Sequence, residues 1–313
     1  MSMTEQRRLR IGTRGSALAL WQAEWVKSQL LAGQQELMVE LVVIKTTGDK
    51  ILDVPLAMVG GKGLFVKEIE EALLDGRADL AVHSVKDMPA ELPQGLHLAA
   101  MPPREDPRDA LISKNGADLD KLPHGARVGT SSLRRAAQLL HLRPDLRIET
   151  LRGNVDTRLR KLKTEGLDAI VLAAAGLKRM ELSRVISEYL EPERILPAVG
   201  QGALGIETRV ADVFTNEIVA SLIHQQTVIT VRAERAFLKR LEGGCQVPIG
   251  AYATTEDETL ILTGMVADLQ GVRLIRQEMR GDARQPEVVG ESLAEMVLES
   301  GGREILAEIY GKQ

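Results

Sequence analysis

Short apolar runs alternate with amphipathic segments in the first third of the chain, which predicts a sheet packed against helices. Residues 9–13 have the pattern of a strand, and Ser16 has the residue type of an N-cap for the helical spacing that follows. Residues 37–44 are almost continuously apolar, as in a strand buried on both faces. A helical pattern over 64–75 and a strand pattern over 79–85 follow. This alternation predicts a parallel sheet.

The same alternation restarts after a break at residues 101–107, which contain three prolines. Strand patterns over 127–129, 147–151 and 168–173 are each followed by a helical segment. We therefore predict a second α/β domain. A further crossing, rich in Gly and Pro, is predicted at residues 195–202.

The last part of the chain changes character, because strands and helices no longer alternate. A turn at residues 268–271 joins two strand patterns, and two helical patterns follow. Such an order indicates a small α+β domain. The strands are predicted over 259–267 and 272–280, and the helices over 227–241, 286–300 and 303–310.

Composition narrows the class of protein and of partner. A chain of 313 residues exceeds what one core usually holds, so two or three domains are expected. Aromatic residues make up 3% and the net charge is -4, which argues against base stacking and against attraction to polyanions. No apolar run approaches membrane-spanning length, and the N-terminus lacks the apolar core of a secretion signal. We expect a cytoplasmic protein without nucleic-acid or membrane partners.

Basic residues gather in one stretch of this acidic chain. Residues 127–163 contain ten basic residues and only three acidic residues. Most charge runs are solvated helix faces. Here, however, residues 129–135 follow a strand and open a helix, which brings hydroxyls, backbone N–H groups and arginines to the positive end of a helix dipole. Residues 151–158 repeat this arrangement with Asn154 as cap, and Arg14 follows a strand in the same way. We favour a small-molecule site for several carboxylates or phosphates at the carboxyl ends of the strands.

A second candidate is Asp87, which follows a strand pattern directly. One interpretation is that Asp87 forms an ordinary surface ion pair with its neighbour Lys86. The other is that its carboxylate, at the end of a strand, passes protons or stabilises a cation. His83 lies inside the strand pattern, so we expect a core residue and not a catalytic base. Residues 46–63 are interpreted as a mobile loop over the site, with Lys62 as a candidate anion contact.

Cys245 is the only cysteine, so it cannot join an intrachain disulfide or a multi-thiolate metal site. It is either a small core residue, which its residue type favours, or a reactive thiol. Gly243, Gly244 and Pro248 predict a tight turn that presents the side chain, which favours the thiol. None of the five histidines lies within ten residues of Cys245, so a cysteine–histidine hydrolase has no local support. No metal site is expected.

Six motifs in order resemble the porphobilinogen deaminase family, and the resemblance extends over about residues 9–310. The motifs cover residues 13–22, 60–65, 83–89, 129–135, 151–154 and 241–248. The resemblance implies an α/β fold, with two domains like those of type II periplasmic binding proteins around a cleft and a small α+β C-terminal domain. The implied domains are 1–102 with 203–221, then 103–202, then 222–313.

The resemblance also implies an activity. Members of this family are transferases that join four porphobilinogen molecules head to tail with loss of ammonia, giving the linear tetrapyrrole hydroxymethylbilane for haem synthesis. The family implies a dipyrromethane cofactor, built from the enzyme's own substrate and bound to Cys245 through a thioether, from which the product chain is extended. Asp87 would stabilise the cation formed when ammonia leaves and assist proton transfer. Each porphobilinogen carries an acetate and a propionate, which gives the basic excess a reason. A monomer is the family expectation.

The remaining implied contacts form two sets. The cofactor set is Cys245, Asp87, Ser84, Lys86, Thr130, Ser132, Arg134, Arg135 and Arg158. The substrate set is Arg14, Ser16, Gln22, Lys62, Phe65, Ser131, Arg152, Arg179 and Gln201. A carboxylate-binding solute-binding protein without catalysis is the alternative function, since it would share the cleft and the arginines. It would usually carry an export signal, however, and it would not need Cys245 in a glycine turn.

Overall fold

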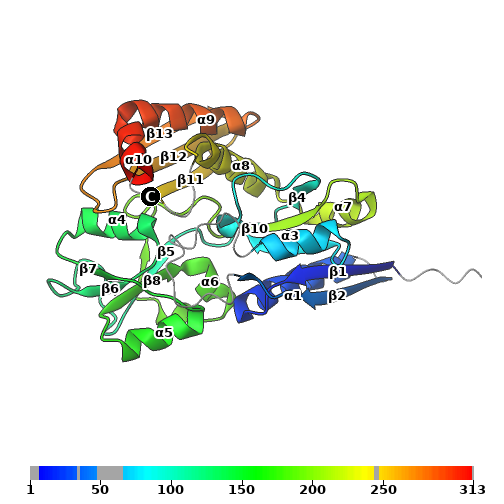
Figure 1. Cartoon of the computed structure of the whole chain (residues 1–313), viewed down its shortest axis with the longest axis horizontal. Helices are drawn as coiled ribbons and strands as arrows, with labels where there is room; N and C mark the ends of the chain where they lie inside the picture. Colours follow the sequence, from blue (N-terminus) through cyan, green and yellow to red (C-terminus); the bar gives the residue numbers. More distant parts are fainter. Residues whose placement is uncertain (1–6, 34–35, 48–65, 243–246, 312–313) are drawn as a thin grey trace, which may run out of the picture. The chain divides into compact units, whose positions relative to one another are not determined.

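The computed structural model describes residues 7–33, 36–47, 66–242 and 247–311 (Figure 1). These residues divide into two compact units. Unit 1 contains 7–33, 36–47, 66–104 and 203–228, and unit 2 contains 105–202, 229–242 and 247–311.

Unit 1 is built on a five-stranded sheet with the order β2-β1-β3-β10-β4. The parallel strands β1 (Arg7–Thr13), β2 (Leu37–Val43) and β3 (Leu80–Ser84) correspond to the predicted ones. Strand β10 (Leu204–Arg209) runs antiparallel between β3 and β4 (Leu96–Ala100). The parallel arrangement of the three predicted strands is confirmed, but the complete sheet is mixed, because β10 enters from a distant part of the sequence and runs antiparallel.

Helices cover both faces of this sheet. Helix α1 (Ala17–Gly33) and helix α7 (Val213–Val219) share a core with Leu80 and Val82 of β3. Helix α3 (Lys67–Leu74) packs on the other face against Ala81. Alternate residues of β3 therefore face opposite layers, as expected for a central strand.

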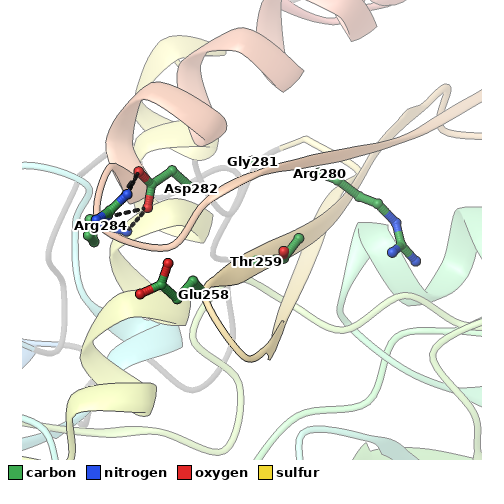
Figure 2. Close-up of a pocket in the computed structure, with 6 residues that line it drawn as sticks. All are labelled: Glu258, Thr259, Arg280, Gly281, Asp282 and Arg284. Atoms are coloured by element: carbon green, nitrogen blue, oxygen red, sulfur yellow. Dashed lines mark hydrogen bonds and ion pairs between the residues drawn. The ribbon is translucent and has the colours of Figure 1, made fainter.

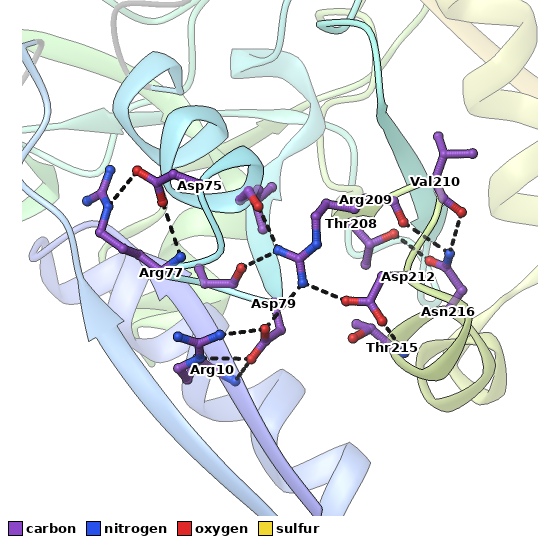
Figure 3. A network of polar contacts seen from close by, with 12 residues as sticks. Arg10, Asp75, Arg77, Asp79, Thr208, Arg209, Val210, Asp212, Thr215 and Asn216 are labelled. Atoms are coloured by element: carbon purple, nitrogen blue, oxygen red, sulfur yellow. Dashed lines mark hydrogen bonds and ion pairs between the residues drawn. The ribbon is translucent and has the colours of Figure 1, made fainter.

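A polar network joins the end of β10 to the start of β3 (Figure 3). The Arg209 guanidinium donates to the carbonyls of Leu73 and Ala78 at 2.6 and 2.7 Å, and its Nη2 lies 3.3 Å from Asp79 Oδ1. Arg10 Nε and Nη2 donate to the same carboxylate at 3.0 and 2.8 Å. Burial alone would raise the pKa of Asp79, but the hydrogen bonds from Arg10 hold it below its usual value. The network thus fixes the inserted strand by charge-assisted bonds.

The first part of unit 2 has a five-stranded sheet with the order β7-β6-β8-β5-β9. Strands β6, β7 and β8 are parallel, whereas β5 runs antiparallel between β8 and β9. The strands are β5 (Asp109–Ser113), β6 (Arg127–Gly129), β7 (Arg147–Glu149), β8 (Ala169–Ala173) and β9 (Glu188–Leu190), and the helices are α4 (Leu133–Leu142), α5 (Val155–Thr164) and α6 (Ala174–Arg179).

The two five-stranded sheets have the same connectivity. In each, the first parallel strand lies between the second and third, and the antiparallel strand is the fourth in the order. The chain leaves unit 1 after β4 and enters β5, and it returns to unit 1 through β10. Both antiparallel strands therefore follow a crossing directly. This repeated arrangement confirms the predicted pair of α/β domains.

The C-terminal part of unit 2 is a three-stranded antiparallel sheet covered by helices (Figure 1). Phe237 is fully buried there, and a Cβ atom on Gly264 would lie 2.5 Å from its ring. This confirms the predicted small α+β domain. Its elements are α8 (Gln225–Arg240), β11 (Ile249–Glu256), β12 (Thr259–Ala267), β13 (Leu274–Asp282), α9 (Pro286–Val297) and α10 (Arg303–Tyr310).

Two of the boundaries that differ from the prediction in this domain have a clear local cause. Strand β13 begins two residues late because the Asp268 carboxylate accepts hydrogen bonds from the backbone of Gln270, Val272 and Arg273, which lengthens the turn. The α-helix predicted over 286–300 ends at Val297 because a π-helical segment (Leu298–Gly302) follows, in which Gly301 has a φ of 108°. Such a backbone is outside the right-handed helical region.

Candidate functional site

The predicted residues of unit 1 lie at one edge of its sheet. Strands β1 and β3 are parallel neighbours, so their carboxyl ends lie at the same edge. Arg14 and Ser16 follow β1, and Lys86 and Asp87 follow β3. Ser16 Oγ accepts a hydrogen bond from Ala19 N at 3.4 Å, which confirms the predicted cap. The sheet therefore brings the two predicted turns of this unit together.

Gln22 and Ser84 join the first helix to the end of β3. Gln22 is 3% exposed, and its Nε2 donates to Ser84 Oγ at 3.0 Å. A buried amide with a fixed partner orients the strand end from which the following turn begins.

Asp87 ends a short 3-10 turn (Val85–Asp87) that leaves the sheet. Two hydrogen bonds hold this turn: Val85 N donates to Ala203 O, and Met88 N donates to Val85 O, both at 3.1 Å. The Asp87 carboxylate is exposed, and no described residue forms a hydrogen bond or an ion pair with it. The structure describes no ion pair between Asp87 and Lys86, and the role of this exposed carboxylate stays a prediction.

Three buried titratable residues lie between the sheet and α3. His83 is 6% exposed, Glu70 7% and Glu207 0%, and His83 Nε2 lies 3.0 Å from Glu207 Oε2. The prediction that His83 is a core residue is confirmed. Burial raises the pKa of Glu70 to about 7, the charge of Glu207 adds to this rise, and His83 opposes it. The folded protein therefore favours the protonated form of Glu70.

This raised pKa makes stability depend on pH. A glutamate in an unfolded chain has a pKa of about 4.3, so between about pH 4.3 and 7 the unfolded chain loses the proton of Glu70 while the folded protein keeps it. Stability from this group is full below that range and falls as the pH rises through it. Glu70→Gln should therefore raise the free energy of unfolding at pH 8 by roughly 1–2 kcal/mol and have little effect at pH 4.5. Urea unfolding at both pH values measures this.

The control is Glu71→Gln, on the exposed side of the same helix. It should change stability equally little at both pH values. Equal effects of Glu70→Gln at pH 4.5 and pH 8 would contradict the assignment.

The predicted residues of unit 2 gather at the equivalent edge of its sheet. Strands β6, β7 and β8 are parallel, so the turns that follow them lie at one edge. Ser131 Oγ donates to Leu151 O at 2.6 Å, which connects two of these turns. Ser132 Oγ accepts from Arg135 N at 3.4 Å and caps α4. The hydroxyl groups therefore shape the turn at the positive end of the helix.

Arg134 and Arg135 are both buried at this edge. Arg135 Nε and Nη2 donate to Asp109 Oδ1 at 3.0 and 2.7 Å, and its Nη1 donates to Val171 O at 3.0 Å. Arg134 Nη1 lies 2.6 Å from Leu196 O and 2.8 Å from Asp109 Oδ2. Arg134 Nε is buried without a hydrogen-bond partner. Of these two arginines, Arg134 thus keeps a donor for an anionic ligand.

Several of the other predicted residues of this unit have defined backbone partners. Asn154 Oδ1 accepts from Thr157 N at 2.9 Å, which confirms the predicted cap of α5, and Arg158 Nε donates to Gly153 O at 2.8 Å. Arg179 Nη2 donates to Gly202 O at 2.8 Å, and burial lowers its pKa to about 10. Thr130, Arg152 and Gln201 complete this group, and Thr130 Oγ1 accepts from Ser132 N at 3.2 Å.

Three predicted site residues, Cys245, Lys62 and Phe65, lie outside the described residues, as does most of the predicted loop 46–63. Sequence reasoning also missed Asp109, which contacts both buried arginines. The available signal was an acidic residue at the start of the apolar run Asp109-Ala110-Leu111-Ile112, where a buried charge demands a partner.

A shallow hollow on the C-terminal domain holds none of the predicted residues (Figure 2). It is lined by Glu258, Thr259, Arg280, Gly281, Asp282 and Arg284. Within this hollow, Arg284 pairs with Asp282 at 2.9 Å. In the described part of the chain, no cluster of His, Cys, Asp and Glu could hold a metal ion, and no helix is long and apolar enough to cross a membrane.

Comparison with known proteins identifies the chain. The family model described as "Porphobilinogen deaminase, dipyromethane cofactor binding domain" matches residues 9–217, and "Porphobilinogen deaminase, C-terminal domain" matches residues 228–299. Porphobilinogen deaminase of Syntrophotalea carbinolica is 60% identical over 96% of both chains. That of Pelobacter propionicus is 57% identical over 98% of this chain and 99% of the relative.

Among solved structures, a TRAP periplasmic solute binding protein from Desulfovibrio salexigens is similar with a TM-score of 0.43, at 12% identity over 98% of this chain and 95% of that chain. A YaeC family lipoprotein from Enterococcus faecalis also has a TM-score of 0.43, at 12% identity over 70% of this chain and 91% of that chain.

The sequence matches place the chain among transferases of tetrapyrrole biosynthesis that use a dipyrromethane cofactor. It belongs to the porphobilinogen deaminase family. The residues present fit the cofactor, whose pyrroles carry carboxylates, because the buried Nε of Arg134 and the capped turn before α4 offer donors to an anion.

Proposed function

We propose that the chain joins four porphobilinogen molecules head to tail into hydroxymethylbilane, and that the two sheet edges divide this work. The edge of unit 2 binds carboxylates, and Asp87 in unit 1 carries out acid–base chemistry. The observation that supports this division is the buried Arg134, which keeps an unmatched Nε donor beside a helix N-terminus.

In this proposal the unit 2 residues hold the carboxylates of the cofactor and of the porphobilinogen units joined to it. Thr130, Ser132, Arg134, Arg135 and Arg158 belong to the cofactor contacts. Ser131, Arg152, Arg179 and Gln201 belong to the contacts with porphobilinogen, as do Arg14, Ser16, Gln22, Lys62 and Phe65. Arginine forks suit carboxylates because two parallel N–H donors match two oxygens.

Asp87 is the proposed catalytic residue. Positive charge develops on the pyrrole of porphobilinogen as ammonia leaves, and a nearby carboxylate stabilises that charge. Asp87 then takes up the proton that is released when the new carbon–carbon bond forms. Ser84 and Lys86, on the same strand end, contact the cofactor. The dipyrromethane, when bound, would supply the free pyrrole α-position to which the first unit is joined, and each later unit would be joined to the terminal pyrrole of the growing chain.

Cys245 is the proposed anchor of the cofactor. A thiolate forms a thioether far more readily than a hydroxyl forms an ether, so Cys245→Ser should abolish the attachment. Intact mass spectrometry should show a covalent dipyrrole adduct on the purified parent and the bare chain mass for Cys245→Ser. An unmodified parent that still turns over porphobilinogen would contradict the proposal. Turnover by an unmodified parent would mean that the product chain grows without a covalent tether.

We propose three functional domains, 1–102 with 203–221, 103–202, and 222–313, each with its own sheet. Movements between domains and of the loop 46–63 would make room for the lengthening product. We also propose that the protein acts as a monomer in the cytoplasm. Light scattering coupled to gel filtration measures the monomer directly, and a mass of two or more chains would contradict it.

A further inference from the structure

Asp109 connects the carboxylate-binding edge to the interior of unit 2. It is the first residue of β5 and is 0% exposed. Its Oδ1 accepts hydrogen bonds from Arg135 at 3.0 and 2.7 Å and from Gln201 Nε2 at 2.9 Å. Its Oδ2 lies 2.8 Å from Arg134 Nη1. Three residues with proposed ligand contacts therefore converge on one carboxylate.

The charges around Asp109 do not cancel. Two buried guanidinium groups, Arg134 and Arg135, lie in the first turn of α4, where the helix dipole is also positive. One buried carboxylate compensates one of them. Burying an unpaired charge is costly, so the remaining positive charge favours an anionic ligand. The unmatched Nε of Arg134 gives such a ligand a donor.

Asp109 stays ionised in this setting. Burial alone would raise its pKa, but the charges of Arg134 and Arg135 outweigh burial and hold the pKa well below its usual range. In turn, burial lowers the pKa of Arg134, and the charge of Asp109 opposes that change. The carboxylate thus favours a charged guanidinium before any ligand arrives.

The packing around Arg134 leaves it few other orientations. Gln138 Nε2 donates to Leu196 O at 3.1 Å, and Leu196 N donates to Gln138 Oε1 at 2.7 Å, so the acceptor of Arg134 is itself fixed. A Cβ atom on Gly250 would lie 3.3 Å from Arg134 Cδ. With the stem of Arg134 confined in this way, Leu196 O and the Asp109 carboxylate together determine where its donors point.

We infer that Asp109 is a positioning residue for the cofactor: it holds the side chains of Arg134 and Arg135 oriented for the carboxylates of the dipyrromethane. This inference rests on the proposed function. It assigns to Asp109 no contact with porphobilinogen or with the reacting atoms. Its effect should therefore appear first in the amount of cofactor that the protein acquires.

The test compares Asp109→Asn with the parent. The asparagine keeps the shape of the side chain but removes its charge and turns donors toward the arginines. The fraction of purified protein that carries the adduct, measured by intact mass, should fall at least about tenfold, since losing one member of a buried charge pair costs more than one tenfold step in affinity. The matched control is Asp106→Asn, which removes a buried carboxylate from Arg108 and Lys178.

A merely structural role predicts a different result. Asp109→Asn and Asp106→Asn would then lower the urea midpoint similarly, and both folded proteins would carry adduct like the parent. That outcome would overturn the inference. A parent without adduct would instead overturn the proposed function, so the two failures are distinguishable.

If Asp109→Asn does not fold, Asp109→Glu tests the positioning role of Asp109 instead. It keeps the charge but moves the carboxylate by one methylene group. We expect an adduct fraction between those of the parent and an unloaded chain, with more porphobilinogen needed to load the cofactor-free protein to half its final mass shift. Loading identical to that of the parent at every porphobilinogen concentration would overturn the inference.

Discussion

Asp87→Asn should lower the turnover of porphobilinogen by roughly 10²–10⁴-fold while the adduct on Cys245 is retained, because the contribution of a positioned acid–base group is of that size. Asparagine has nearly the same shape as aspartate but can neither accept the proton nor balance a positive pyrrole. The turn around Asp87 is held by backbone hydrogen bonds, so the fold should persist. Steady-state turnover, with intact mass and circular dichroism on the same samples, measures the effect.

Two comparisons strengthen this experiment. Asp87→Glu keeps the charge and should recover part of the lost rate, because a displaced carboxylate still stabilises a cation. Glu71→Gln, an exposed acid of the same unit outside the site, should have parental turnover. Near-normal rates for Asp87→Asn would reject the catalytic role.

Gly202→Ala should destabilise the fold by roughly 2–4 kcal/mol, the largest effect on stability that we predict. Gly202 has a φ of +88°, and a Cβ atom there would lie 2.3 Å from Glu105 O. Because that atom belongs to the backbone, no rotation of a side chain can relieve the overlap. The Gly202 carbonyl also accepts hydrogen bonds from Glu105 N at 3.2 Å and from Arg179 at 2.8 Å. Urea unfolding monitored by circular dichroism measures the loss.

Gly116→Ala is the matched control. Gly116 has a φ of +70°, and nothing lies within 4 Å of the position of its Cβ atom. This substitution carries the backbone cost of a positive φ alone, roughly 1–2 kcal/mol. If both variants lost the same stability, the close approach of Gly202 to Glu105 would be irrelevant to folding.

Sequence patterns predicted the elements whose stabilising contacts are local or whose faces are uniformly apolar. Strand β12 has the bounds that its apolar run predicts, and α8 differs by no more than two residues at either end. Strands β5 and β10 were not predicted. Strand β10 contains Glu207 and Thr208, both 0% exposed, so its polar residues conceal a central strand. Its neighbours lie more than a hundred residues earlier, and no local pattern reports such pairing.

The candidate site was predictable to a similar extent. Arg14, Asp87 and Arg134 each follow a strand closely in the sequence, which predicts that they lie at sheet edges. The structure has this arrangement in both units. The internal partners of these residues were not predictable. Asp109 is 26 residues from Arg135 in sequence, and only the folded sheet brings them within 3 Å.

The position of β10 also has a consequence for the folding of the chain during its synthesis on the ribosome. Strand β10 lies between β3 and β4, so the sheet that the first hundred residues begin cannot close until residue 209 has been synthesised. By then residues 105–202 already contain all five strands of their own sheet. The N-terminal domain, which is begun first, should therefore be completed after the domain that is inserted into it. Until then the edges of its strands stay unpaired, and a nascent chain in this state is prone to aggregation and to binding by chaperones.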